Sequence, residues 1–317
     1  EDNNHNNQNP DNILIQHDYG IRCARFLDSK VPKHEYDYFL PVKRNNQKLI
    51  CVVIPLFNED WSGLFQTLKS LSESFLPNGH RMIYQVIQDG YSKISKSMKE
   101  KFKEIYPSDL WKELDDPKLF PVNEGVTYIF QYEKENDDKS LELAPTKIPS
   151  PTGEILDMDI VLVVKKDNRK KHNSHEWFFS EEGGFCYHYQ PEFCLATDCS
   201  TIFHPKCIKR MAKVLIRDDN CAVCTGRQVC MSAEQQGSED SWIEWLYRQA
   251  QTYDFESSFS NFMGAFAIFG FLPVVPGPCG LYRWKLMTSE GNHEGPLRWY
   301  FRIVNTPAEE CGLILAN

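Results

Sequence analysis

The stretch LICVVIPL, residues 49–56, is a continuous apolar run that is rich in β-branched side chains. Such a run is typical of a strand that is buried on both faces of a sheet. Apolar residues then recur at helical spacing over residues 61–71, and the run MIYQVIQ at 82–88 indicates a second strand. That strand ends at Asp89-Gly90, which is a turn signal. The order predicts two parallel strands that are joined by a helix.

The rest of the chain continues this alternation. Further strands are expected over residues 126–132, 160–164, 193–197 and 222–229, and further helices over residues 92–105, 205–217 and 239–260. Strands that alternate with helices are typical of the α/β class. We therefore expect a mostly parallel sheet that carries helices on both faces.

Composition divides the chain into parts of different character. Residues 1–12 are polar and Asn-rich, which predicts a disordered tail, and residues 13–48 are expected to pack on the domain as an N-terminal extension. Residues 49–317 form the main domain. Within it, the polar stretch 133–157 is interpreted as an insertion.

Charge and cysteine content narrow the class of protein. The 317 residues include 35 Lys and Arg against 44 Asp and Glu, a net charge of −9, which argues against a nucleic-acid-binding protein. Eleven cysteines, an odd number, in a chain that shows no secretion signal are expected to be reduced thiols in the cytosol. The uncharged stretch 257–282 is broken by glycine and proline, so we expect a buried core or interface segment there and no transmembrane helix.

Polar residues follow three of the expected strands. Pro55, Phe57, Asn58 and Glu59 come after the first, Asp89 and Gly90 after the second, and Asp198 after the strand at 193–197. In open α/β sheets, ligands bind at the carboxyl ends of the strands. The group predicts a carboxylate-lined pocket for a metal and a hydroxyl-rich ligand, although each residue alone also suits an ordinary turn or a helix cap.

The segment KKHNSHEWFF, residues 170–179, resembles the signature of chitin synthases, which are family-2, GT-A-type glycosyltransferases. His172 stands where that signature has an apolar residue. Three later segments resemble further motifs of the family in the same order: QTYDFESSFSN at 251–261, PGPCGLYRW at 276–284 and GPLRWYF at 295–301. The resemblance runs from about residue 49 to residue 317, and it implies a GT-A, Rossmann-like fold.

The resemblance also implies roles for individual residues. The residues that it assigns to UDP are Pro55, Phe57, Asn58, Glu59, Asp89, Gly90 and Lys171. Those assigned to the donor sugar are Asn173, Ser174, His175, Pro276, Gly277, Tyr282 and Arg283. Asp198 resembles a metal-binding acid for Mg²⁺ or Mn²⁺, but the second carboxylate of the usual motif is missing, so the diphosphate is expected to supply the other ligands.

For the whole protein, the resemblance implies a membrane enzyme at the cytosolic face of the plasma membrane. Its expected reaction is the inverting transfer of N-acetylglucosamine from UDP-GlcNAc to a β-1,4-linked chitin chain, with a homodimer as one expected assembly. The family's catalytic base and membrane helices would follow Asn317, so the isolated chain is expected to bind donor without elongating chitin. If it did elongate chitin, Glu239, Asp240 and Glu290 would be the first candidates for the base.

Three alternatives stay open from the residues. Cysteines and a histidine between residues 194 and 224 could form a zinc-binding interaction module, although Cys221/Cys224 is the only pair at C-x2-C spacing. A hyaluronan- or cellulose-type synthase would share the acidic motifs. His175 could shuttle protons, or it could be a positioning residue at the start of a helix that is capped by Asn173 or Ser174. Trp177, Phe178 and Phe179, and the aromatic side chains of residues 255–271, are expected in the core.

Overall fold

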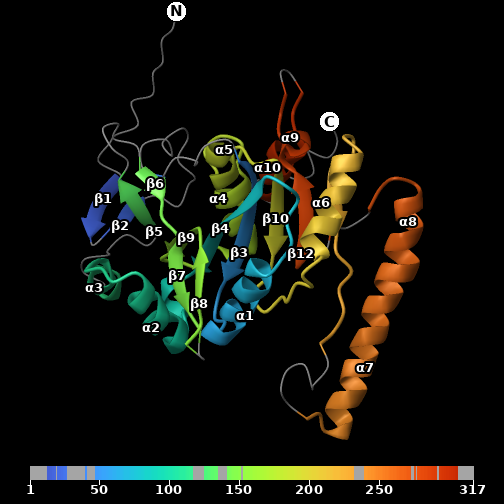
Figure 1. Ribbon diagram of the computed structural model, residues 1–317, viewed down its shortest axis with the longest axis horizontal. Coiled ribbons are helices and arrows are strands. Elements are labelled where there is room, and N and C mark those ends of the chain that lie inside the picture. The colour runs from blue at the N-terminus through green and yellow to red at the C-terminus, as the bar shows by residue number, and fades with distance from the viewer. Residues whose placement is uncertain are drawn as a thin grey trace, which may run out of the picture.

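The computed structural model describes residues 13–18, 20–26, 40, 47–116, 125–134, 141–150, 153–231, 239–272, 275, 277–290 and 293–305. Its main feature is a ten-stranded sheet in the order β1-β2-β5-β9-β4-β3-β10-β12-β11, with β6 paired to β5 (Figure 1). The strands of this sheet are β1 (Ile13–Asp18), β2 (Ile21–Phe26), β3 (Lys48–Leu56), β4 (His80–Asp89), β5 (Val126–Lys134), β6 (Leu141–Leu143), β9 (Ile160–Lys165), β10 (Phe193–Thr197), β11 (Val223–Thr225) and β12 (Cys279–Arg283). The α/β prediction is confirmed.

The four central strands, β9, β4, β3 and β10, run parallel to one another. The flanking strands β5 and β12 run antiparallel to their neighbours β9 and β10, so the sheet as a whole is mixed. The first quoted run explains the centre: along β3, Ile50, Val52 and Ile54 face one apolar core, while Cys51 and Val53 face the other. A strand that is apolar on both sides requires cover on both sides.

Helices supply that cover on each face of the sheet. One core contains side chains of α1 (Trp61–Ser72), α2 (Lys96–Ile105) and α6 (Cys207–Arg217). The other contains side chains of α4 (Lys170–Phe179), α5 (Phe185–Tyr189), α9 (Trp284–Met287) and α10 (Pro296–Asn305). The short helices η3 (Tyr91–Lys93) and α3 (Leu110–Asp115) flank α2 in the chain. The expected helical cover on both faces is therefore present.

The N-terminal extension and the polar insertion both carry strands. The hairpin β1–β2 joins the sheet through β5, so the described part of residues 13–48 continues the sheet. Between β5 and β9, the insertion forms β6 and a separate two-stranded sheet of β7 (Thr146–Pro149) and β8 (Ile155–Met158). Residues 1–12, which were interpreted as a tail, lie outside the described residues.

Two expectations from the sequence were wrong. The strand expected over 222–229 is limited to β11, and Val229 is exposed. The aromatic side chains expected in the core between residues 255 and 271 lie on, or directly after, a helical arm that stands beside the sheet (Figure 1). This arm is made of α7 (Trp242–Glu256), η5 (Ser257–Met263) and α8 (Gly264–Ile268). Phe262 and Phe269 are 53% and 78% exposed there. Within the described residues, none of the helices has the length and apolar character that a membrane span requires.

Candidate active site

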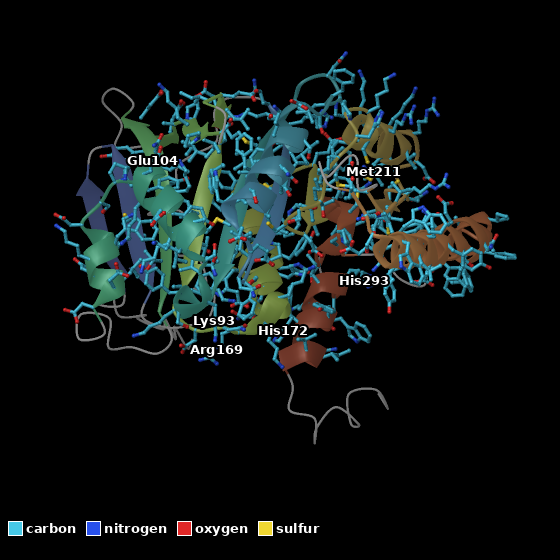
Figure 2. The ribbon with its side chains drawn as sticks, turned by 90° about the horizontal axis from the view of Figure 1, so that it is seen from below. Lys93, Glu104, Arg169, His172, Met211 and His293 are labelled. Atoms are coloured by element: carbon cyan, nitrogen blue, oxygen red, sulfur yellow. The ribbon has the colours of Figure 1, made fainter. Side chains whose placement is uncertain are left out.

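A cavity of about 480 Å³ opens at the carboxyl ends of the central strands. It is lined by Pro55, Leu56, Phe57, Glu59, Asp89, Asn168, Lys170, Lys171, Ser174, Asp198 and Cys199. The parallel register brings these residues together, because β3 pairs with β4 up to Leu56 and with β10 up to Val53. Lys93, Arg169 and His172 lie at one edge of the molecule (Figure 2). The sequence predicted a site at the carboxyl ends of these strands, but it did not single out Asn168 or Lys170.

Asp89, which lines the cavity, forms a buried ion pair with Lys165, which does not line it. Lys165 Nζ lies 2.6 Å from Oδ1 of Asp89, and both side chains are almost fully buried. Lys165 also donates to Ser174 Oγ at 3.2 Å, and the backbone N–H of Arg169 donates to Asp89 Oδ1 at 2.9 Å. Burial lowers the pKa of Lys165, and the adjacent Asp89 opposes that shift. Asp89 is thus held in one orientation by a counter-ion that the sequence interpretation missed.

The turns beside Asp89 are fixed by their own hydrogen bonds. The Phe57 N–H donates to Glu59 Oε2 at 2.5 Å, and the buried Gln88 amide donates to the Phe57 carbonyl at 2.7 Å. Gly90 adopts a φ of +93°, and a Cβ there would lie 3.2 Å from the backbone nitrogen of Asn168. A larger residue would strain this turn. Asn58 is exposed and does not line the cavity.

Helix α4 places the signature segment against the cavity. Its N-cap is Arg169, so the expectation that Asn173 or Ser174 caps the helix was wrong: both lie within it, one turn further on. Lys171 forms an ion pair with Asp198, and the two side chains are 43% and 38% exposed. Since exposed ion pairs contribute little to stability, this pair can open at low cost for a ligand.

His175 lies one turn after Lys171 in a desolvated position. Burial, with a contribution from Lys171, lowers the pKa of His175 to about 4, while Asp198 opposes the shift. Its Nε2 is buried and has no hydrogen-bond partner among the described residues, and the same is true of Oδ1 of Asn173. The ring is therefore neutral at pH 7. The core prediction for Trp177, Phe178 and Phe179 is confirmed, since all three are buried.

The low pKa of His175 predicts that acid destabilises the fold. In the unfolded chain a histidine titrates near 6.5, so between pH 6.5 and 4 the unfolded state binds the additional proton. This contribution is fully present above pH 6.5 and is lost as the pH falls to 4, at a cost on the order of 3 kcal/mol. Chemical denaturation across this range should show the slope, and His175→Gln should flatten it. An unchanged slope in the variant would assign the pH dependence to other groups.

The residues expected at the donor sugar are not all brought to the cavity. A Cβ on Gly277 would lie 3.2 Å from Lys171 Nζ and 3.8 Å from Asp198 Oδ2, so Gly277 borders the site. Tyr282 packs against Phe179 with ring centroids 5.9 Å apart, and Pro276 lies outside the described residues.

Arg283 lies at the opposite end of the strands from the cavity. Because β12 runs antiparallel to β10, Arg283 pairs with Phe193 at the start of that strand, whereas the cavity is at its end. Its guanidinium donates to backbone carbonyls that include those of Asp218 and Cys221, at 3.0 and 3.2 Å. The position near the end of α6 suits a cation. The structure therefore gives Arg283 a structural position and does not bring it to the cavity.

Metal ligands are sparse in the part of the chain that the structure describes. It contains no group of three or more His, Cys, Asp or Glu side chains that could hold a metal ion, and so no ligand set for the zinc alternative. Asp198 still fits Mg²⁺ or Mn²⁺, since such ions are often bound by one or two carboxylates together with substrate phosphates. Glu239, Asp240 and Glu290 do not line the cavity, and Asp240 is paired with Arg248 at 2.8 Å.

The fold and the cavity define an α/β glycosyltransferase domain of the GT-A type. The family described as "Chitin synthase-like glycosyltransferase domain" matches residues 50–317, and the chain belongs to that family. It is 24% identical over 284 residues to chitin synthase 2 of Rhizopus oligosporus, and the aligned region covers 84% of this chain and 31% of that protein. It is 23% identical over 283 residues to chitin synthase C of Aspergillus oryzae, with 84% of this chain and 29% of that protein covered. The chain thus spans about a third of the length of these relatives.

Proposed function

We propose that this domain binds UDP-GlcNAc and presents its sugar for transfer to a growing β-1,4-linked chitin chain. The observation that carries the proposal is that Asp89, held by the buried Lys165, lines the same cavity as the exposed Lys171–Asp198 pair. A fixed carboxylate suits a nucleobase N–H, and a mobile cation beside a carboxylate suits a diphosphate with its metal ion.

The buried pair is proposed to select the base. The two hydrogen bonds that hold the Asp89 carboxylate use Oδ1, and among the described residues Oδ2 accepts none. That oxygen can accept the imide N–H of uracil. Cytosine has an acceptor at the same ring position and would leave the carboxylate without a donor. Lys165 acts here as a positioning residue, since it holds Asp89 without contacting the base.

The exposed pair is proposed to bind the diphosphate. Lys171 would leave Asp198 and contact the phosphate oxygens, which a compact ammonium can do without a fixed geometry. Asp198 would then be available to Mg²⁺ or Mn²⁺, and the ion, when bound, would offset the charge that develops on departing UDP. Near the proposed diphosphate site, His175 Nε2 and Asn173 Oδ1 have no hydrogen-bond partner among the described residues. Because the His175 ring is neutral at pH 7, it adds no charge beside Lys171 and Asp198.

The proposed setting is the cytosolic face of the plasma membrane. All cysteines that the structure describes are free thiols, which suits a reducing compartment. The sugar is tested by competition among UDP-GlcNAc, UDP-glucose and UDP-glucuronate for the purified chain. We expect UDP-GlcNAc to bind most tightly. A preference for UDP-glucose or UDP-glucuronate would favour the cellulose- or hyaluronan-type alternative.

Binding of UDP is expected to depend on a divalent metal through Asp198. Calorimetric titration with Mg²⁺ or Mn²⁺ should give tighter UDP binding than titration in chelator. In Asp198→Asn the two titrations should converge, because a neutral amide is a weak ligand for these ions. Equal affinity with and without metal for the folded wild-type chain would remove the metal from the proposal.

Asp89→Ala and Lys171→Ala should weaken binding in different ways. Loss of Asp89 removes a contact to the base, so UDP and free uridine should weaken alike, whereas loss of Lys171 should weaken UDP far more than uridine. A lost charge-assisted contact is worth about 1.5–3 kcal/mol, or roughly 10- to 150-fold in Kd. Asp89→Ala leaves the buried Lys165 without an acceptor, whereas Asp89→Asn keeps an amide oxygen that can accept from Lys165, so Asp89→Asn serves as the milder variant. If Lys171→Ala weakened uridine as much as UDP, the assigned roles would be wrong.

A further inference from the structure

A cluster of thiols lies where α6 packs against β11 and β12. Cys207 is the first residue of α6, Cys279 begins β12, and Cys224 lies on β11 opposite Leu281. Cys279 is 4% exposed, and Cys207 and Cys224 are partly exposed. A Cβ on Gly226 would lie 2.6 Å from Cys279 Sγ and 3.3 Å from Cys207 Sγ. Both sulfur atoms therefore lie beside the space that Gly226 leaves open by having no side chain.

The two neighbouring thiols, Cys207 and Cys279, are chemically unequal. The neighbouring Cys279 thiol lowers the pKa of Cys207, and Arg210 lowers it further. The Cys207 sulfur, together with burial, raises the pKa of Cys279, whose thiol donates to Met211 Sδ at 3.8 Å. The start of an eleven-residue helix also favours a thiolate on Cys207. Cys207 is therefore the nucleophile of the pair, and it is the one that solvent reaches.

Other cysteines of the described part lack this combination. Cys186 and Cys194 have sulfur atoms 3.4 Å apart, but both are fully buried, and burial raises the pKa of each. Burial, with Cys221 and Cys207 nearby, raises the pKa of Cys224 to about 11. Proximity alone therefore does not distinguish the Cys207–Cys279 pair from the Cys186–Cys194 pair. The Cys207–Cys279 pair combines proximity with solvent access to Cys207 and a lowered pKa of the Cys207 thiol.

We propose that Cys207 and Cys279 form a peroxide-oxidisable dithiol, in which Cys207 is oxidised first and Cys279 then closes the disulfide. The Cys207 thiolate attacks one oxygen of the peroxide, the O–O bond breaks, and the sulfur becomes a sulfenic acid while hydroxide leaves and takes up a proton as water. The Cys279 sulfur then attacks the sulfenic sulfur, and its proton leaves with the hydroxyl as a second water. The two sulfurs lose two electrons in total, and one peroxide is reduced to two waters.

The place of this pair gives the modification a consequence for the cavity. Cys279 lies two residues after Gly277, which borders Lys171 and Asp198. The Thr197 hydroxyl donates to the carbonyl of the intervening Pro278 at 2.9 Å. A disulfide would tie this segment to α6. The proposed oxidation itself concerns these thiols alone, so its test needs no nucleotide and does not depend on the proposed function.

The test is peroxide treatment of the folded chain, followed by alkylation, digestion and mass spectrometry. We expect a disulfide-linked peptide that joins Cys207 to Cys279, and loss of the free Cys207 thiol about tenfold faster than that of Cys194. In Cys279→Ser, Cys207 should accumulate as a sulfenic acid that dimedone traps. In Cys207→Ser, Cys279 should stay a thiol. Cys224→Ser is the matched control on the same face and should form the bridge as the wild type does.

Three results would overturn the proposal. The first is a bridge from Cys207 to Cys224 or Cys221 in place of Cys279. The second is no increase of dimedone labelling at Cys207 in Cys279→Ser, with circular dichroism confirming that the variant is folded. The third is oxidation of Cys186 and Cys194 at the same rate as Cys207 in the folded chain, since reactivity would then not follow access and activation.

Discussion

Lys165→Met is expected to lower the free energy of unfolding by about 3–5 kcal/mol, because it leaves the buried Asp89 carboxylate without its counter-ion. Methionine matches the length of the lysine stem, so the loss reports the missing charge more than a cavity. Denaturant unfolding, followed by circular dichroism, measures the change. UDP binding should fall as well, since the carboxylate that is proposed to accept the uracil N–H loses the group that holds it.

Two further variants separate charge from packing. Lys166→Met makes the same substitution one residue later, at a partly exposed position, and should change stability by less than about 1 kcal/mol. The double variant Asp89→Asn/Lys165→Met replaces the ion pair with two neutral side chains and should recover most of the stability lost in Lys165→Met. It should not recover the preference for UDP over CDP, because an amide can present a donor or an acceptor. Equal losses in the single and double variants would show that the pair is not coupled.

The sequence predicted those residues of the cavity that directly follow an apolar, strand-like run. Asp89 and Asp198 were predicted at one edge because each follows an apolar run, and parallel strands end together. Lys165 was missed because its role depends on a neighbour relation: β9 lies beside β4, in a register that places Lys165 opposite Asp89. No spacing within residues 160–166 shows which strand lies alongside.

The wrong expectations for Arg283 and for the aromatic side chains of residues 255–271 also have their cause in tertiary structure. Arg283 was expected at the cavity because it belongs to a motif with Tyr282. Since β12 runs antiparallel to β10, Arg283 lies at the end of the strands that is away from the cavity. The aromatic side chains of residues 255–271 were expected in the core because the uncharged stretch that contains most of them is broken by glycine and proline and does not suit a membrane span. The structure leaves several of them exposed; Phe269, for example, is 78% exposed. Direction of a strand and partners of a helix are tertiary properties that composition does not encode.

The other large effect is expected for Trp177→Ala, at about 3–5 kcal/mol of unfolding free energy. Trp177 is fully buried and packs against Tyr128 of β5, with ring centroids 5.8 Å apart, so it fixes α4 to the sheet. The same helix carries Lys171 and His175.

Trp245→Ala is the matched control, because it removes the same side chain from α7, where Trp245 is 54% exposed, and should change stability by less than about 0.5 kcal/mol. Differential scanning calorimetry and UDP titration of both variants give the comparison. If α4 is positioned by this contact, Trp177→Ala should weaken UDP more than uridine even where the chain remains folded, since Lys171 moves with the helix while Asp89 stays on β4. Equal stability losses in the two variants would mean that Trp177 does not anchor α4.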